Sequence, residues 1–248
     1  MSGWCCAGLL WWPYPADAGA PFLTEDPEPI ELGHYEVYLF SMGFGTARGT
    51  FGFLPAFEFN YGLIPEGQIH FQAPLAFNTE GGSTNFGYGD TELGFKYRFI
   101  QEDKNGWIPQ VGTYPLLELP TGDETRGLGA GHVRAFLPVW LQKSFGDWTT
   151  FGGGGLWLNH SVATGDQDFW FFGWALQRKV TEKWTVGGEI FHATADKIGG
   201  KDLTGFNLGA LYRIDDHHQF LFSAGRGIQN ASERDRFSWY IAYQITGP

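Results

Sequence analysis

The stretch "YGDTELGFKYRFI", residues Tyr88–Ile100, decides the fold. From Thr91 onward, every second residue lies in one set that is mostly large and apolar: Thr91, Leu93, Phe95, Tyr97 and Phe99. The positions between them carry the charged residues Glu92, Lys96 and Arg98. A period of two places the two sets on opposite faces of a strand, whereas a helix has a period of 3.6. The stretch therefore predicts a β-strand with one apolar face and one charged face.

The same alternation recurs along the chain in about twelve runs. They are Gly33–Gly43, Gly49–Gly62, Glu66–Asn78, Tyr88–Ile100, Trp107–Leu119, Gly131–Phe145, Trp148–His160, Asp168–Val180, Lys183–Ala195, Leu203–Ile214, His218–Gln229 and Asp235–Thr246. The connections after the second, fourth, sixth, eighth and tenth runs are short, such as "IPEG", "EDKNG" and "TEK". Those after the third, fifth, seventh and ninth are longer, such as "NTEGGSTNFGYGD" and "PTGDETRGLGAG". Short periplasmic turns opposite longer extracellular loops are typical of outer-membrane barrels.

The composition supports this fold class. Of 248 residues, 18% are aromatic and 37 are Gly, while only 17% are charged, below the roughly 25% of an average soluble domain. No apolar run reaches the length of about 18 residues that a membrane-spanning helix needs. A closed barrel pairs every backbone polar group in lipid. We therefore predict an all-β chain, a single transmembrane antiparallel β-barrel of about 12 strands over residues 33–248, in the outer membrane of a diderm bacterium.

The expected partners follow from the same features. A net charge of -11 without a basic stripe gives no support to nucleic-acid binding. Outer-membrane lipid should surround the wall, and a small-molecule solute should pass within it. The pattern does not determine the oligomeric state.

The first 32 residues differ from the rest. Residues 1–20 combine a short apolar stretch with small residues, which indicates a signal peptide. Ala16-Asp17-Ala18 and Ala18-Gly19-Ala20 both fit a cleavage pattern, and Pro21 directly after the second disfavours that one. No Lys or Arg precedes the apolar stretch, so the signal is atypical or truncated. Residues 21–32, "PFLTEDPEPIEL", are Pro-rich and acidic and cannot form a regular strand. They form either a periplasmic tail or a plug, in which Glu and Asp meet Arg98, Arg134 or Arg213.

The polar positions of the runs are the candidate lining of the lumen. They are Glu36, Glu58, His70, Glu92, Lys96, Arg98, Glu118, His132, Arg134, Glu189, Arg213 and Arg226. Buried charges must be paired or hydrated. The set therefore predicts either a polar passage that selects by size and charge or a network of paired charges that fills a narrow barrel. Four Trp near run ends, namely Trp107, Trp148, Trp184 and Trp239, are expected at the membrane interfaces.

Three segments resemble a known family. They are "PFLTEDPEPIELGHYEVY" (Pro21–Tyr38), "LPTGDETRGLGAG" (Leu119–Gly131) and "LPVWLQKSFGDWTTFGGGGLWLN" (Leu137–Asn159). Together they resemble the outer-membrane barrels named after the MetA pathway of phenol degradation. The resemblance implies a barrel of the outer membrane and the passage of small, often aromatic or hydrophobic, compounds. Outer-membrane barrels usually end in an aromatic residue, whereas this sequence ends in "YQITGP".

The remaining motifs favour no enzyme. The glycines at 152–155 lack the Lys-Ser or Lys-Thr of a phosphate loop. His160-Ser161 would point to opposite faces of a strand unless the strand has ended, and His217-His218 lies in a short turn without zinc-ligand spacing. We therefore expect a passive channel or transporter for small molecules, with no catalytic residues, metal or cofactor. The alternatives are a lipid-modifying enzyme and a structural or adhesive barrel.

Overall fold

A computed structural model describes residues 21–161 and 165–248; the expected signal peptide at residues 1–20 lies outside them. Within the described residues there are fourteen strands in one antiparallel sheet. They are β1 (Tyr35–Gly45), β2 (Gly49–Ile64), β3 (Gly67–Glu80), β4 (Ser83–Tyr88), β5 (Thr91–Ile100), β6 (Gln110–Thr113), β7 (Leu116–Leu119), β8 (Arg134–Phe145), β9 (Trp148–Leu158), β10 (Phe169–Lys179), β11 (Trp184–Ala193), β12 (Leu203–Arg213), β13 (His218–Gln229) and β14 (Phe237–Gly247).

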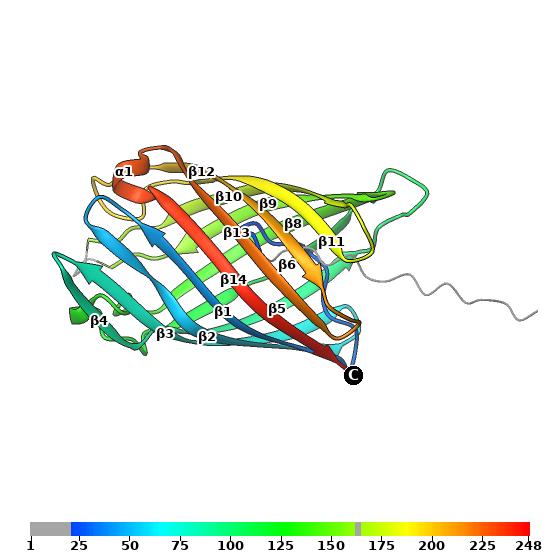
Figure 1. Cartoon of the computed structure of the whole chain (residues 1–248), viewed down its shortest axis with the longest axis horizontal. Coiled ribbons are helices and arrows are strands. Elements are labelled where there is room, and N and C mark those ends of the chain that lie inside the picture. Colours follow the sequence, from blue (N-terminus) through cyan, green and yellow to red (C-terminus); the bar gives the residue numbers. More distant parts are fainter. Residues whose placement is uncertain (1–20, 162–164) are drawn as a thin grey trace, which may run out of the picture.

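The sheet closes into a barrel of twelve antiparallel strands (Figure 1). β1 pairs with both β2 and β14, so no edge remains open there. β4 and β5 are two pieces of one wall strand, because both pair with β3. β6 and β7 are likewise two pieces, because both pair with β5 and with β8. The predicted fold class and strand number are confirmed.

The connections are sorted between the two ends of the barrel. The turn end carries residues 65–66, 101–109, 146–147, 180–183 and 214–217, and the loop end carries 46–48, 81–82, 120–133, 194–202, 230–236 and the described residues between β9 and β10. The first and last strands both reach the turn end, where Tyr35 pairs with Gly247. The 3₁₀ turn η1 (Glu124–Arg126) and the short helix α1 (Ala231–Arg234) lie in loops. Among the described residues, no helix is both long and apolar enough to cross a bilayer.

Two predicted boundaries are wrong. The connection at 101–109 is longer than "EDKNG", and Trp107 lies in it with 97% of its surface exposed, outside β6. The stretch "NTEGGSTNFGYGD" is not a loop, because β3 and β4 form a hairpin that continues through it. Its turn residues Gly81 and Gly82 both have positive φ, 59° and 84°. Positive φ at both central residues is the mark of a type I′ hairpin turn, which extends strands instead of ending them.

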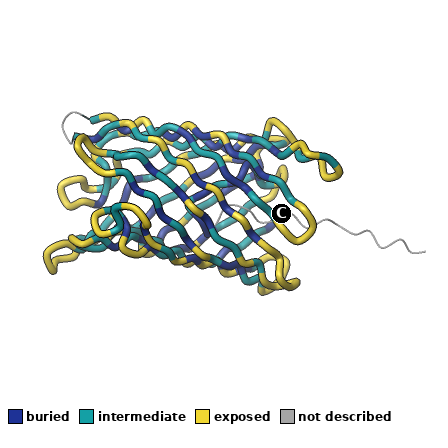
Figure 2. The backbone as a smooth tube through the Cα atoms, turned by 90° about the horizontal axis from the view of Figure 1, so that it is seen from above, coloured by how far each residue is buried: buried dark blue, intermediate teal, exposed yellow. Residues whose placement is uncertain are grey.

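The outer face of the wall is an apolar belt. On β10, Trp170, Phe172 and Trp174 are exposed, whereas the alternate residues Gly173 and Ala175 are buried. Figure 2 shows buried and exposed positions alternating along the strands, with exposed residues gathered in the connections at both ends. Trp148 and Trp184 begin strands at the turn end. This belt is the surface that a closed barrel presents to acyl chains.

One bulge changes which side chains face inward. Phe57 pairs with Leu39 on the outer face, but the register of β2 shifts between Phe53 and Ala56. Beyond that shift Phe53 pairs with Met42 and packs against a cluster of buried lumen residues. Counted with a strict period of two along the sequence, Phe51 and Phe53 would share a face with Phe57. The extra residue of the bulge turns both to the lumen side, since side chains alternate with a period of two.

Candidate functional site in the barrel lumen

A cavity of about 1320 Å³ lies inside the barrel. At the turn end it is bordered by His217 and by Glu66, and farther along by the aromatic residues Phe44, Trp157 and Phe171. Glu36, Tyr38 and other wall residues line one side of it, and residues of the segment 21–32 line another.

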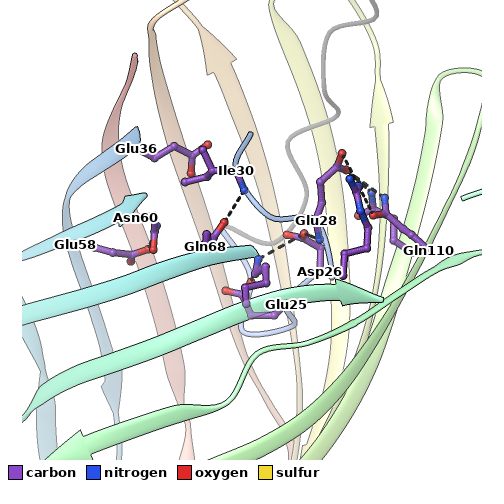
Figure 3. Close-up of polar contacts among 12 residues, drawn as sticks. Glu25, Asp26, Glu28, Ile30, Glu36, Glu58, Asn60, Gln68 and Gln110 are labelled. Atoms are coloured by element: carbon purple, nitrogen blue, oxygen red, sulfur yellow. Dashed lines mark hydrogen bonds and ion pairs between the residues drawn. The ribbon is translucent and has the colours of Figure 1, made fainter. Parts of the chain in front are cut away.

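The segment 21–32 is held inside the lumen by hydrogen bonds to strands on different sides of the wall. The Leu23 and Thr24 backbone N–H groups donate to Glu189 of β11 at 2.9 and 2.8 Å. The Ser223 hydroxyl of β13 donates to the Pro21 carbonyl at 2.6 Å, and the Ile30 N–H donates to Gln68 of β3 at 2.7 Å. Figure 3 shows part of the segment inside the barrel, with Ile30 beside Gln68 and Glu28 beside Gln110. Residues 21, 23, 24 and 30 thus contact lumen-facing side chains of three strands.

The acidic residues of this segment meet two of the predicted lumen cations. Lys96 Nζ lies 3.2 Å from Glu25 and 3.5 Å from Asp26. Arg98 lies 3.4 Å from Glu28, which also accepts hydrogen bonds from Gln110 and Gln142. The expected contact with Arg98 is therefore present, and Lys96 is a partner that the sequence did not suggest.

The expected contact with Arg134 is not formed, because Arg134 is bound elsewhere. Its guanidinium donates to both carboxylate oxygens of Glu118 at 2.5 and 2.6 Å, and it lies over the Trp157 ring at 5.3 Å. Glu118 and Arg134 are directly opposite each other on β7 and β8. The strand register thus pairs this arginine with Glu118 and not with the segment.

A second charged cluster surrounds His70. Its two ring nitrogens face Asn60 at 2.8 Å and Glu92 at 3.1 Å, and Glu58 lies 3.6 Å away. The Tyr114 ring packs edge-on against the imidazole. β2, β3 and β5 bring these residues together because they are neighbours in the wall and their alternate residues point inward.

The structure places the twelve predicted lumen residues in different surroundings. Seven border the cavity: Glu36, Glu58, His70, Glu92, Lys96, Arg98 and Arg213. Glu189 holds the segment, and Glu118 and Arg134 pair with each other. His132 precedes β8 and is tied to the carbonyls of Ala130 and Asn159, so it belongs to a loop.

Arg226 was placed on the wrong face. It is exposed and pairs with Phe206 on β12, and it shares its parity on β13 with the outward Phe220 and Phe222. The inward positions of this strand are odd-numbered, such as Leu221 and Ser223, which are buried. An arginine near the end of a lipid-facing row can extend to the membrane interface, which explains its tolerance there.

The aromatic part of the lumen was not predicted from the sequence. Phe136 and Trp140 are buried and pack with Tyr114, Trp157 and Phe171. Their positions were readable, because Phe136 and Trp140 share the parity of Arg134 and Gln142 along β8. Several aromatic residues therefore face inward and border the cavity.

Glycines make room for this interior. Gly153 lies opposite Trp140, and a Cβ on Gly153 would lie 3.1 Å from the Trp140 ring and 2.1 Å from the Val139 carbonyl oxygen. A Cβ on Gly173 would lie 2.1 Å from Thr24 Oγ1. The glycine run therefore serves close packing, as glycines within strands often do.

The two histidine motifs lie at the ends of strands or beyond them. β9 ends at Leu158, so His160 and Ser161 lie beyond it, where their backbone N–H groups donate to Asp168 and Asp166. The His217 N–H donates to Asp215 in the turn between β12 and β13, and this bond lowers the pKa of Asp215. Within the described part of the chain, no three His, Cys, Asp or Glu side chains converge as metal ligands.

Comparison with known proteins supports the same architecture. A family described as "Putative MetA-pathway of phenol degradation" matches residues 40–244. The NanC porin has a similar structure, with a TM-score of 0.57 at 10% identity over 84% of this chain and 98% of that one. The translocator domain of the autotransporter NalP from Neisseria meningitidis gives 0.50 at 10% identity over 86% of each chain. At such identities the likeness concerns the fold alone. No curated protein sequence matches the chain significantly.

Proposed function

Because the chain belongs to the family described as "Putative MetA-pathway of phenol degradation", we propose that this outer-membrane barrel is a channel for the passive passage of small molecules. Solutes move down their concentration gradient, and no cofactor or energy source takes part. The observation that carries the proposal is the cavity of about 1320 Å³, which reaches from the turn end past the segment 21–32 to the aromatic residues. A wall with this interior offers water and small solutes a path that lipid does not.

The aromatic lining supports hydrophobic or aromatic compounds among the solutes. Phe136, Trp157 and Phe171 present ring faces and edges along the cavity, against which a flat apolar group can stack. The description of the family points to the same class of compound.

The segment 21–32 narrows the passage in this proposal. Its anchors on β3, β11 and β13 lie on different sides of the wall, so it occupies cross-section that would otherwise be open. A barrel of twelve strands is wider than the eight-stranded barrels that side chains can fill, and narrower than open porins of about sixteen strands. A single extended segment can therefore restrict it without closing it.

Liposome swelling tests the channel. Proteoliposomes carrying the whole chain should swell in small neutral sugars faster than empty liposomes, and the rate should fall as the sugar becomes larger. Equal rates with and without the protein would overturn the channel.

The role of the segment needs a separate variant. Deletion of residues 21–32 should increase single-channel conductance, because it removes material from the lumen. Replacement of the same residues by a Gly/Ser stretch of equal length is the matched control, since it keeps the chain length but removes the acidic side chains that meet Lys96 and Arg98. Conductance that both variants leave unchanged would show that the segment does not restrict the passage.

A further inference from the structure

The border of the lumen cavity carries an excess of acidic groups. Among the described residues, ten acidic residues border it: Glu25, Asp26, Glu28, Glu31, Glu36, Glu58, Glu66, Glu92, Asp215 and Asp216. Three Lys or Arg side chains of the described residues also border it, namely Lys96, Arg98 and Arg213. The imbalance extends from the turn end to the middle of the barrel and involves the wall as well as the segment 21–32.

Pairing does not remove this excess, because basic groups are shared. Lys96 lies between Glu25 and Asp26, at 3.2 and 3.5 Å. Arg98 lies between Glu28 and Glu66, at 3.4 and 2.6 Å. Figure 3 shows Glu25, Asp26 and Glu28 of the segment within the same interior as Glu36 and Glu58 of the wall.

His70 repeats the arrangement, with Glu58 and Glu92 at 3.6 and 3.1 Å. Each of these three basic groups therefore meets two carboxylates. A lumen with surplus carboxylates attracts cations and repels anions, as rings of Asp and Glu do in cation channels.

The aromatic residues of the same cavity add a preference for a particular kind of cation. The Lys96 ammonium lies 4.8 Å from the centre of the Tyr114 ring, and the Arg134 guanidinium lies over Trp157. Ring faces inside this barrel are thus already in contact with cations. Aromatic faces attract ammonium groups, including quaternary ones, most strongly where water is partly excluded.

We infer that the passage favours organic cations, meaning ammonium ions with an apolar body, over anions of the same size. The carboxylates draw the charged group into the lumen, and the aromatic residues accommodate the apolar body. This inference rests on the proposed function, because selectivity requires a passage.

Efflux of a matched pair of ions tests it. Benzyltrimethylammonium and benzenesulfonate have similar size, each carries one ring, and each keeps its charge at every working pH. Proteoliposomes loaded with either ion should release the ammonium ion at least about fivefold faster than the sulfonate. A small neutral sugar in the same vesicles reports whether the passage is open.

The outcomes separate the two proposals. Release of the sulfonate as fast as the ammonium ion, or passage of the sugar without the ammonium ion, overturns the cation preference alone. If neither ion nor the sugar leaves faster than from empty liposomes, the channel itself is refuted, and the cation preference with it.

Variants locate the preference in the lumen. Asp216→Lys changes a turn residue on the cavity border and leaves the strands intact, so its folding is not in question. It should lower the ammonium-to-sulfonate ratio at least about twofold. Glu182→Lys lies in the turn between β10 and β11, away from the cavity border, and should leave the ratio unchanged. Equal ratios in both variants would contradict the assignment.

Discussion

Thr24 donates to one carboxylate oxygen of Glu189 twice, through its backbone N–H at 2.8 Å and through its hydroxyl at 2.5 Å. The two residues are 165 positions apart in the sequence. The other oxygen accepts from the Leu23 N–H at 2.9 Å and from the Asn207 amide at 2.6 Å. A carboxylate of the wall thus satisfies backbone groups of a segment that has no strand partners at this point.

Replacement of Glu189 should therefore loosen the segment. Hydrogen bonds to a charged acceptor contribute about 1.5–3 kcal/mol each, and Glu189→Ala removes three that reach residues 23 and 24. Amide exchange at Leu23 and Thr24, followed by mass spectrometry in detergent, should accelerate at least about tenfold. Glu189→Gln keeps one acceptor oxygen, so its exchange rates should lie between those of the unchanged protein and those of Glu189→Ala. Glu182→Ala is the control, and an equal acceleration there would point to general destabilisation.

Gly173 offers a way to displace the segment without changing any residue that anchors it. A Cβ at this position would lie 2.1 Å from Thr24 Oγ1 and 3.0 Å from Thr24 Cβ. Gly173→Ala should therefore push Thr24 off the wall and increase solute flux, as measured by liposome swelling. The double variant Gly173→Ala/Thr24→Gly removes the clash and should return flux toward the level of Thr24→Gly alone. A Gly173→Ala channel with unchanged flux would show that this contact does not restrict passage.

In the lipid-facing belt, the loss of unfolding free energy caused by an arginine should depend on how deep in the membrane the residue lies. Leu208 lies midway along β12 with 65% of its surface exposed, and Ile228 lies near the loop end of β13. Leu208→Arg should lower the free energy of unfolding in lipid vesicles by about 2–4 kcal/mol, and Ile228→Arg by about 0–1 kcal/mol. Urea titration in vesicles of one lipid measures both. Equal costs at the two positions would contradict the assigned membrane depth.

Asp123 gives the loop between β7 and β8 a pH dependence. Its carboxylate accepts hydrogen bonds from the Thr125 hydroxyl at 2.6 Å and N–H at 3.1 Å, and the hydroxyl bond is the main cause of its lowered pKa. Because the folded loop holds this pKa below its ordinary value near 3.8, the ionised carboxylate stabilises the loop at pH values above 3.8. That stabilisation is lost as the pH falls through the lowered pKa. Amide exchange at Thr125, corrected for its intrinsic pH dependence, should therefore increase only in that acidic range. Asp123→Asn should abolish the pH step.

Local sequence predicts much of this barrel. The alternation through Tyr88–Ile100 predicts a strand and its two faces correctly, apart from a break at Gly89 and Asp90. Local signals mislead where one residue changes the phase: the bulge between Phe53 and Ala56 turns two Phe to the lumen. Arg226 was read on the wrong face although it shares its parity with the outward Phe220 and Phe222. The alternation along the strands indicates which aromatic residues face the lumen. An aromatic side chain by itself suggests contact with lipid.

By itself, the sequence determined the closed two-faced wall, because side-chain alternation is a local property of each strand and an apolar face needs lipid. It also determined that residues 21–32 carry charges opposite to some of the lumen. Only the tertiary structure decided which charges meet. Lys96 and Arg98 bind the segment, whereas Arg134 is taken by Glu118 on the neighbouring strand. Such contacts depend on strand register and on distances across the barrel. No local pattern in the sequence specifies which distant residues meet when the barrel closes.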